Sequence, residues 1–292
     1  MRILITGSKG QLGNELQRIL STGRADIGPI PEEYLGETEV CATDVDTLDI
    51  LDEEAVEDMT AETRPELIIN CAAYTNVDAC ESHPDLAFRL NAEGASILAR
   101  AAQKQGATLV HVSTDYVFSG TDPRARIESD LPDPQSVYGK TKLAGEQLVA
   151  EISSSCHIVR TAWLYGLVGN NFVKTILGLA RKNGRIQVVD DQFGNPTNAN
   201  DLAYEILRIA QSRAYGIWHC TNEGSCSWFD FASEIVDQAG VPCEKLPCTT
   251  EEFPRPAPRP RFSSLENARL QALLGNEMRP WREALRSYLG KL

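Results

Sequence analysis

Short apolar runs alternate with longer amphipathic stretches along the first half of the chain. The runs are continuously apolar rather than alternately apolar and polar, which suits strands of a sheet that helices cover on both faces. They lie at 2–6, 38–43, 67–71, 108–112 and 156–160, and the stretches with helical periodicity at 11–20, 52–61, 84–105 and 136–152. Strands that alternate with helices predict an α/β fold with a doubly wound parallel sheet.

The second half of the chain predicts more elements in a less regular order. We expect helices at 171–182, 200–212 and 228–239, strands at 185–189 and 216–220, and short helices near 264–273 and 280–289, after a proline-rich stretch at 242–262. This pattern favours a smaller, mainly C-terminal lobe beside the sheet domain. We place the sheet domain at 1–162, with 185–220 returning to it in part, and the lobe at 163–184 and 221–292. Segment 21–37 contains glycine, proline and acidic residues and is expected to be a surface excursion.

Composition narrows the class of protein. The 292 residues include 42% hydrophobic ones, enough to bury a large core. The formal charge of −13 and the absence of a Lys/Arg cluster argue against nucleic acid as the main partner, because phosphate contacts need clustered cations. No apolar run approaches the roughly 20 residues of a membrane span, and residues 1–6 lack the pattern of a signal peptide. We expect a cytoplasmic protein that binds a small molecule and no membrane.

The cysteines and histidines lack the spacing of a metal site. None of the eight cysteines belongs to a C-x-x-C pair, and several lie in apolar runs, so we expect free thiols. None of the four histidines has metal-ligand spacing with another. We therefore expect no zinc site.

A glycine motif follows the first predicted strand. Gly7, Gly10 and Gly13 have G-x-x-G-x-x-G spacing and open a predicted helix. Glycine lets the turn adopt positive φ and lets the backbone approach a pyrophosphate, while the helix N-terminus supplies free N–H groups. The motif predicts a dinucleotide site of the Rossmann type. A plain glycine-rich turn between a strand and a helix is the alternative.

Asp44 ends the second predicted strand, where a doubly wound fold often places an acid that accepts hydrogen bonds from the adenosine ribose. An acid there favours NADH over a cofactor with a 2′-phosphate, but Lys9 or Arg24 could offset this preference. NADH and NADPH therefore both stay open as the cofactor. Asp46 and Asp49 follow closely, and each also fits a solvated loop carboxylate.

Tyr138 and Lys142 form a Y-x-x-x-K pattern on a predicted helix, and Thr114 lies just past the fourth predicted strand. Side chains four residues apart share one helix face. A phenol with a pKa of about 10 is a poor acid at neutral pH, but a nearby ammonium lowers that pKa toward the working pH. The pattern predicts proton transfer by Tyr138, tuned by Lys142. An exposed Tyr and Lys on an amphipathic helix is the alternative.

Further stretches extend these motifs along nearly the whole chain: INCAAYTNVDACE, Asn91, STDYVFSG, VYGKTKLAGEQ, VRTAWLYG, GNNFVKT, DDQFGNPT and RPRFSSLEN. Together with TGSKGQLG they resemble the extended short-chain dehydrogenase/reductase superfamily, and within it the dTDP-4-dehydrorhamnose reductases. The resemblance implies that residues 1–162 form an NAD(P)-binding Rossmann domain and that the lobe binds the substrate.

The resemblance also implies a role for each matching residue. Tyr138 is the expected proton donor, Lys142 its tuner and a partner of the nicotinamide ribose, and Thr114 a hydrogen-bond partner of the substrate carbonyl. The cofactor is expected to contact Gly7, Gly10, Gln11, Leu12, Gly13, Asp44, Asp49, Ile50, Cys71, Ala72, Ala73, Tyr74, Thr75, Tyr138 and Lys142. The sugar nucleotide is expected to contact Val77, Asp78, Thr114, Asp115, Tyr116, Trp163 and Arg259.

Two of these residues have competing interpretations. Trp163 fits a core residue as well as a flat wall for a sugar or base. Arg259 could bind a diphosphate by paired hydrogen bonds or simply belong to a polyproline-type loop.

Some members of this superfamily hold magnesium at a dimer interface through acidic residues. Glu15 matches one such position, but Asn200 followed by Asp201 leaves the ligand set incomplete. We therefore expect no bound metal, and either a monomer or a homodimer.

The resemblance implies hydride transfer from NAD(P)H to the 4-keto group of dTDP-6-deoxy-L-lyxo-4-hexulose, giving dTDP-L-rhamnose. Two alternatives stay open. One is another nucleotide-sugar reductase or epimerase, and the other is a non-catalytic dinucleotide-binding regulatory subunit, such as the beta subunit of S-adenosylmethionine synthetase. Trp163 and the NNFVKT stretch resemble the reductases more than the regulatory subunits.

Overall fold

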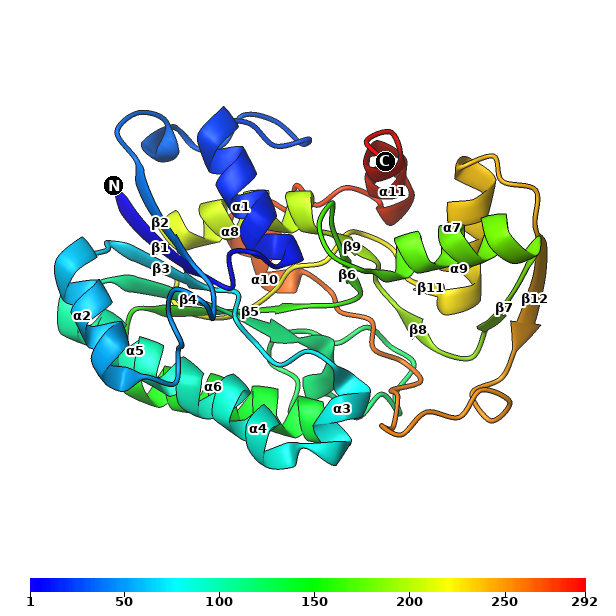
Figure 1. Ribbon diagram of the computed structural model, residues 1–292, viewed down its shortest axis with the longest axis horizontal. Coiled ribbons are helices and arrows are strands. Elements are labelled where there is room, and N and C mark those ends of the chain that lie inside the picture. Colours follow the sequence, from blue (N-terminus) through cyan, green and yellow to red (C-terminus); the bar gives the residue numbers. More distant parts are fainter.

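The computed structural model describes residues 1–292, and a six-stranded sheet lies at its centre (Figure 1). Every pair of neighbouring strands in this sheet is parallel, in the order β10-β5-β4-β3-β1-β2. The strands are β1 (Arg2–Thr6), β2 (Glu39–Thr43), β3 (Leu67–Asn70), β4 (Thr108–Thr114), β5 (Cys156–Thr161) and β10 (Gly216–His219). The predicted doubly wound α/β fold of the Rossmann type is confirmed.

Helices cover both faces of the sheet, which explains the continuously apolar strands. Side chains from α1 (Gln11–Thr22) and α8 (Ala199–Gln211) share one core cluster with Ile3 and Ile5. Leu4, between these two isoleucines, points to the opposite face and packs in a second cluster with α5 (Gly94–Gln105) and α6 (Val137–Ile152). Helix α2 (Glu53–Thr63) packs beside α5 on that second face.

The order of the strands opens a crevice at one edge of the sheet. The chain runs from β1 to β2 on one side and then to β3 on the other side of β1. The loops that follow β1 and β3 therefore leave the sheet in opposite directions, and open α/β sheets bind ligands at such a switch point. Thr6 and Asn70, the last residues of these two strands, lie opposite each other.

The predicted helix at 84–105 differs in detail from the observed one. It consists of α4 (Pro84–Phe88), a π-helical turn at Arg89–Glu93, and α5, and a short helix α3 (Val77–Ser82) precedes it. The π turn places Asn91 inward, where its amide receives the Tyr74 N–H at 2.7 Å and donates to the Tyr74 carbonyl at 3.2 Å. The turn thus anchors the loop that follows β3.

A second, smaller core lies beside the end of the sheet, at the right of Figure 1. It is built by α7 (Phe172–Asn183), β7 (Arg185–Val189), α9 (Trp228–Gln238) and α11 (Trp281–Leu289). Strand β7 pairs with β12 (Glu244–Cys248) instead of joining the central sheet, whereas α8 and β10 of the segment 185–220 do belong to the sheet layers. The division of the chain into domains stays a prediction.

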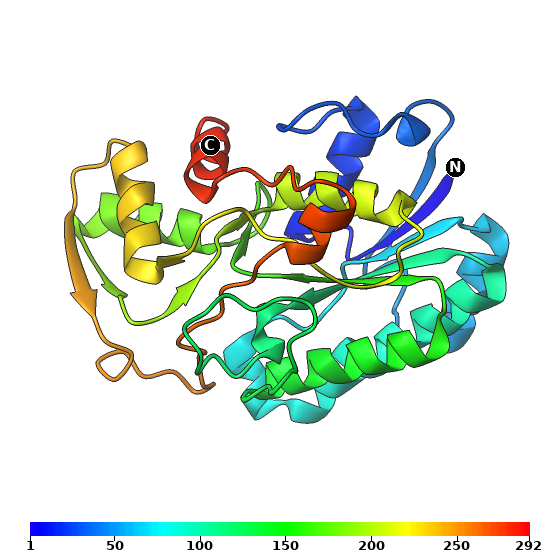
Figure 2. The same ribbon diagram turned by 180° about the vertical axis from the view of Figure 1, so that it is seen from behind.

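Short elements connect the two cores. Strand β6 (Leu164–Tyr165) pairs with β9 (Thr197–Asn198), β8 (Phe193–Gly194) pairs with β11 (Cys226–Ser227), and α10 (Ala268–Leu273) packs near β10. The proline-rich segment after β12 returns from the smaller core to the sheet domain (Figure 2). No helix of the protein is both long and apolar enough to pass through a membrane.

Segment 21–37 is more closely packed than a surface excursion. Tyr34, in a short 3₁₀ turn, is buried, and its hydroxyl donates to the Leu207 carbonyl at 3.0 Å. Ile30 is also buried in the core cluster that contains α8. The segment therefore covers part of α8.

Candidate active site

A cavity of about 840 Å³ lies at the carboxyl ends of the central strands. Most of the predicted catalytic, cofactor-binding and substrate-binding residues line this cavity, although they come from segments far apart in the chain. Those that line it are Gly7, Gly10, Gln11, Leu12, Gly13, Asp44, Asp49, Ile50, Cys71, Ala72, Ala73, Thr75, Val77, Thr114, Asp115, Tyr116, Tyr138, Lys142 and Trp163. Tyr74, Asp78 and Arg259 do not line this cavity.

The glycine motif forms the part of the cavity next to β1 and β3. Gly7 has a φ of 67°, and a Cβ there would lie 2.7 Å from the backbone nitrogen of Ala72. A Cβ on Gly13 would lie 2.3 Å from the Gly7 carbonyl oxygen. Gly10 is the N-cap of α1 and has no side chain to occupy the first-turn N–H groups. The turn is therefore both tight and able to receive an anion at the helix terminus.

Asp44 holds the loop after β2 in place. Its carboxylate accepts hydrogen bonds from the backbone N–H groups of Lys9, at 2.8 Å, and Val45, at 2.9 Å. The Lys9 ammonium lies 2.5 Å from an oxygen of Asp46. Lys9, which lines the same cavity, is thus paired with an acid.

Tyr138 lies in the first turn of α6, which Ser136 caps by accepting the Gly139 N–H at 3.1 Å. A Cβ on Gly139 would lie 2.2 Å from the Tyr116 carbonyl oxygen, so glycine lets α6 approach the turn after β4. This close approach brings the Tyr138 ring edge-on to Tyr116, with centroids 5.5 Å apart.

The electrostatics of Tyr138 differ from the sequence-based expectation. Burial raises the pKa of Tyr138, and a hydrogen bond with Thr114 opposes that rise. Lys142 instead donates to the Val112 carbonyl at 2.7 Å. Burial lowers the pKa of Lys142 to about 8, against the opposing charges of Glu146 and Cys71. Tyr138 is therefore a neutral hydroxyl at neutral pH, and its tuning by Lys142 stays a prediction.

Thr114 and Asp115 form a polar pair beside Tyr138. The Thr114 hydroxyl donates to an Asp115 oxygen at 2.9 Å. Burial raises the pKa of Asp115 to about 6, although hydrogen bonds with Ser263 and Thr114 work in the opposite direction. The pair places polar hydrogen-bonding groups within an otherwise largely apolar wall.

Trp163 has an unusual backbone conformation. Its φ is 46°, and Arg64 at the end of α2 is the other non-glycine residue with positive φ. Such a conformation costs about 1–3 kcal/mol and persists only where the surrounding structure holds it. The Trp163 ring stacks on Trp228, with centroids 3.5 Å apart and planes 7° apart.

Lys9, which was named from the sequence only for its effect on cofactor choice, also lines the cavity. The lining residues that sequence reasoning did not name as site residues are Val45, Leu48, Leu90, Val112, Ser113, Thr161, Ala162, Leu164 and Trp228. Val112, Ser113 and Thr161 are strand residues next to selected ones, so their position along β4 and β5 was a usable signal. Trp228 had no such signal, because it starts a helix in the smaller core.

Asp78 and Arg259 form an ion pair next to the cavity. The Arg259 guanidinium donates to an Asp78 oxygen at 2.8 Å, which links α3 to the proline-rich segment. A small second cavity borders Arg259 and shares Tyr116 with the large one. Tyr74 turns its backbone toward Asn91.

Glu15 and Asn200 contact each other through a hydrogen bond of 3.0 Å. Glu15 also accepts from Arg18 at 2.9 Å, and Asp201 pairs with Arg279 at 2.6 Å. The carboxylates named in the metal hypothesis are thus bonded to nitrogen donors of the same chain.

The chain is similar over almost its whole length to proteins of known family. The family described as RmlD substrate binding domain matches residues 1–292. The structure of a dTDP-4-dehydrorhamnose reductase from Clostridium acetobutylicum is 46% identical, with a TM-score of 0.93 over 100% of this chain and 99% of that one. A dTDP-4-dehydrorhamnose reductase from Bacillus anthracis in complex with NADP is 41% identical, with a TM-score of 0.93 and the same coverage. A probable dTDP-4,6-dihydroxy-2-methyloxan-3-one 4-ketoreductase from Streptomyces antibioticus is 41% identical over 98% of this chain and 94% of the relative.

Proposed function

Because the chain belongs to the RmlD substrate binding domain family, we propose that it is an NAD(P)H-dependent dTDP-4-dehydrorhamnose reductase. It reduces the 4-keto group of dTDP-6-deoxy-L-lyxo-4-hexulose to give dTDP-L-rhamnose. The observation that carries the proposal is the grouping of Tyr138, Lys142 and Thr114 in one cavity with the glycine turn. The names of the similar proteins from Clostridium acetobutylicum and Bacillus anthracis support the substrate.

The residues around the glycine turn fit a dinucleotide. A Cβ at Gly7 or Gly13 would collide with backbone atoms, and the N–H groups at the start of α1 are open to a pyrophosphate. Gly7, Gly10, Gln11, Leu12 and Gly13 would hold the pyrophosphate. The adenosine end would lie against Asp44, Asp49 and Ile50, and the loop from Cys71 to Thr75 would lie along the cofactor.

The chemistry follows from the groups at the carboxyl ends of β4 and β5. When bound, NAD(P)H supplies a hydride to the carbonyl carbon of the sugar. Tyr138 donates its hydroxyl proton to the carbonyl oxygen. The Thr114 hydroxyl has one proton, which it donates to Asp115 in the free protein; when the substrate is bound, this O–H would turn and donate to the carbonyl oxygen instead. Lys142 carries a positive charge that favours the phenolate left on Tyr138. With cofactor and substrate bound, the apolar residues of the cavity would limit the access of water to the reacting atoms.

The substrate part of the proposal rests on residues between the sheet and the smaller core. Val77, Tyr116 and Trp163 line the cavity there, and Arg259 lies next to it. Asp78 holds Arg259 through the ion pair, which orients the guanidinium for a diphosphate. The name of the Streptomyces antibioticus relative favours a second candidate, the 4-ketoreduction of another dTDP-linked sugar.

The nucleotide should supply binding energy that orients the keto carbon. We therefore expect the dTDP-linked 4-ketosugar to react far faster than the free 4-keto-6-deoxyhexose, with a lower kcat as well as a higher KM for the free sugar. Steady-state kinetics on both substrates tests the proposed function. Comparable kcat/KM values for the two would overturn the nucleotide-sugar assignment, and reduction of only a different dTDP-linked ketone would favour the second candidate.

The cofactor preference tests the position of Asp44. We expect NADH to support turnover, because an acid at the end of β2 accepts the ribose hydroxyls and repels a 2′-phosphate. The measurement is kcat/KM for NADH and NADPH with the same sugar substrate. A preference for NADPH of about a hundredfold or more would show that Asp44 does not have this role.

A chelator should leave both the activity and the molar mass in solution unchanged. The reason is that Glu15 and Asp201 already accept hydrogen bonds from Arg18 and Arg279 at short distances. Turnover assays and light scattering with and without the chelator provide the measurement. Loss of activity or a change of molar mass would show that Glu15 has metal-binding partners.

A further inference from the structure

The stacked pair of Trp163 and Trp228 has a role that the sequence motifs do not assign. We propose that Trp228 is a substrate-binding residue, which forms with Trp163 one aromatic wall for the sugar ring of the nucleotide sugar. This inference rests on the proposed function. It adds a residue from the smaller core to the binding site.

The conformation of Trp163 is the first observation. Trp163 lies between β5 and β6 and does not end a helix, so its positive φ has no role in capping. Its carbonyl accepts the Thr197 N–H at 3.2 Å, and a Cβ at Gly194 would lie 2.5 Å from ring atom Cε2. The Trp163 ring therefore has a fixed position: its backbone conformation is strained, and the absence of a side chain at Gly194 leaves the space that the ring occupies.

The position of Trp228 is the second observation. Its ring lies parallel to that of Trp163 at 3.5 Å and covers one face of it. Both indoles are half-buried, and both line the large cavity. A ligand in this part of the cavity therefore meets the pair rather than Trp163 alone.

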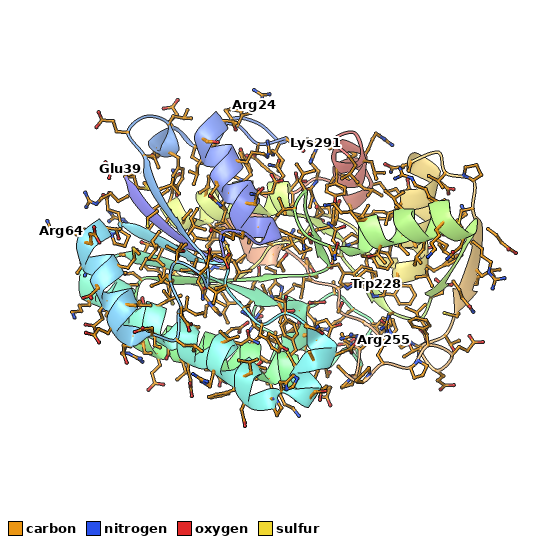
Figure 3. The ribbon with its side chains drawn as sticks, in the orientation of Figure 1. Arg24, Glu39, Arg64, Trp228, Arg255 and Lys291 are labelled. Carbon is orange, nitrogen blue, oxygen red and sulfur yellow. The ribbon has the colours of Figure 1, made fainter.

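Trp228 is itself firmly held by the smaller core. It is the first residue of α9, which has a complete capping box at Ser227, and its N–H donates to the Gln192 carbonyl at 3.2 Å. Phe172 of α7 packs against its ring, with centroids 4.4 Å apart. Figure 3 shows Trp228 between the sheet domain and the helices of the smaller core. The aromatic wall therefore joins both parts of the molecule.

The wall lies next to the reacting group, which identifies the ligand portion. Thr114 pairs in register with Thr161, two residues before Trp163, and all three line the same cavity with Tyr138. Because the keto carbon must lie at Tyr138 and Thr114, the part of the substrate beside the wall is the sugar. A deoxysugar has an apolar methyl group and C–H groups on its ring, which pack well on aromatic faces.

The test compares Trp228→Ala and Trp228→Phe with the parent protein. We expect Trp228→Ala to raise KM for the dTDP-linked 4-ketosugar by about tenfold and to lower kcat, since the sugar is less well oriented. Trp228→Phe keeps an aromatic face and should retain most of the activity. The dissociation constant of NADPH should not change in either variant. Trp281→Phe is the matched control, because Trp281 is buried in the same core and does not line the cavity.

A spectroscopic measurement separates binding from structure. Two stacked indoles give an exciton couplet in far-ultraviolet circular dichroism, which should vanish in both Trp228 variants and persist in Trp281→Phe. Parent-like KM and kcat in both Trp228 variants, with the couplet lost, would overturn the inference while the proposed function stands. Weaker NADPH binding in step with a lower Tm would also overturn it, in favour of a purely structural role. A parent protein that reduces no nucleotide-linked ketosugar would remove the proposed function and this inference together.

Discussion

Replacing Tyr138 with phenylalanine is expected to lower kcat by about 10²–10⁴-fold, the range for a positioned proton donor. The substitution removes the hydroxyl but keeps the ring that packs edge-on against Tyr116. Burial raises the pKa of Tyr138, so the group carries its proton at neutral pH. Transfer of that proton to the carbonyl oxygen would leave a phenolate, which the positive charge of Lys142 favours. The measurement is kcat at saturating NAD(P)H and dTDP-linked 4-ketosugar.

Two controls accompany this variant. Titration with NAD(P)H should give the dissociation constant of the parent, because the ring still fills its place in the cavity. Tyr204→Phe removes a hydroxyl from α8 that donates to Glu277 at 2.9 Å. Because Tyr204 does not line the cavity, this variant should keep the parent kcat. A Tyr138→Phe protein with near-parent kcat would exclude Tyr138 as the proton donor.

Replacing Glu146 with alanine is expected to lower the free energy of unfolding by about 3–5 kcal/mol, the usual cost of breaking a buried ion pair. Glu146 receives the Arg160 guanidinium at 2.6 Å and the Ser113 hydroxyl at 2.5 Å. The side chains of Arg160 and Glu146 are 1% and 3% exposed, so removal of the carboxylate leaves a charge without a partner in the core. Urea unfolding monitored by circular dichroism measures the loss.

The matched control is the exposed pair of Lys104 and Glu57, whose side chains are 62% and 46% accessible. Glu57→Ala should cost less than about 1 kcal/mol, because solvent screens the pair. The double variant Glu146→Leu with Arg160→Met should recover much of the lost stability, since apolar residues can replace a buried pair. Equal losses in Glu146→Ala and Glu57→Ala would show that Arg160 finds another partner or reaches water.

The features predicted well from the sequence are those that depend on neighbours along the chain. Each run expected in the central sheet contains a strand. Strands β1, β3, β4 and β5 are mostly buried, as continuously apolar runs predict, whereas β2 at the edge of the sheet is largely exposed. Gly7 was identifiable because a strand, a glycine turn and a helix are contiguous. Tyr138 and Lys142 were identifiable because one helical turn places them on the same face.

The features that were missed depend on segments far apart in the chain. Strand β7 was expected to return toward the sheet domain, but its partner β12 lies within the proline-rich stretch. The π turn directs the Asn91 amide to the backbone N–H and carbonyl of Tyr74, with which it forms two hydrogen bonds. No local sequence pattern predicts this contact. The glycine, proline and acidic residues of segment 21–37 predicted a surface excursion, but Tyr34 is buried and donates a hydrogen bond to Leu207 of α8.

Local patterns along the chain were enough to predict the α/β fold, the glycine turn and the Tyr-Lys pair, because periodicity and turn chemistry act over a few residues. The pairing of Arg160 with Glu146 and the stacking of Trp228 on Trp163 could not be predicted in this way, because they depend on long-range packing. These contacts arise where β5 meets α6 and where the smaller core meets the end of the sheet. Which side chains meet there depends on how the layers of the fold pack together. This packing produces no periodic pattern in the amino-acid sequence, so it could not be predicted from local patterns.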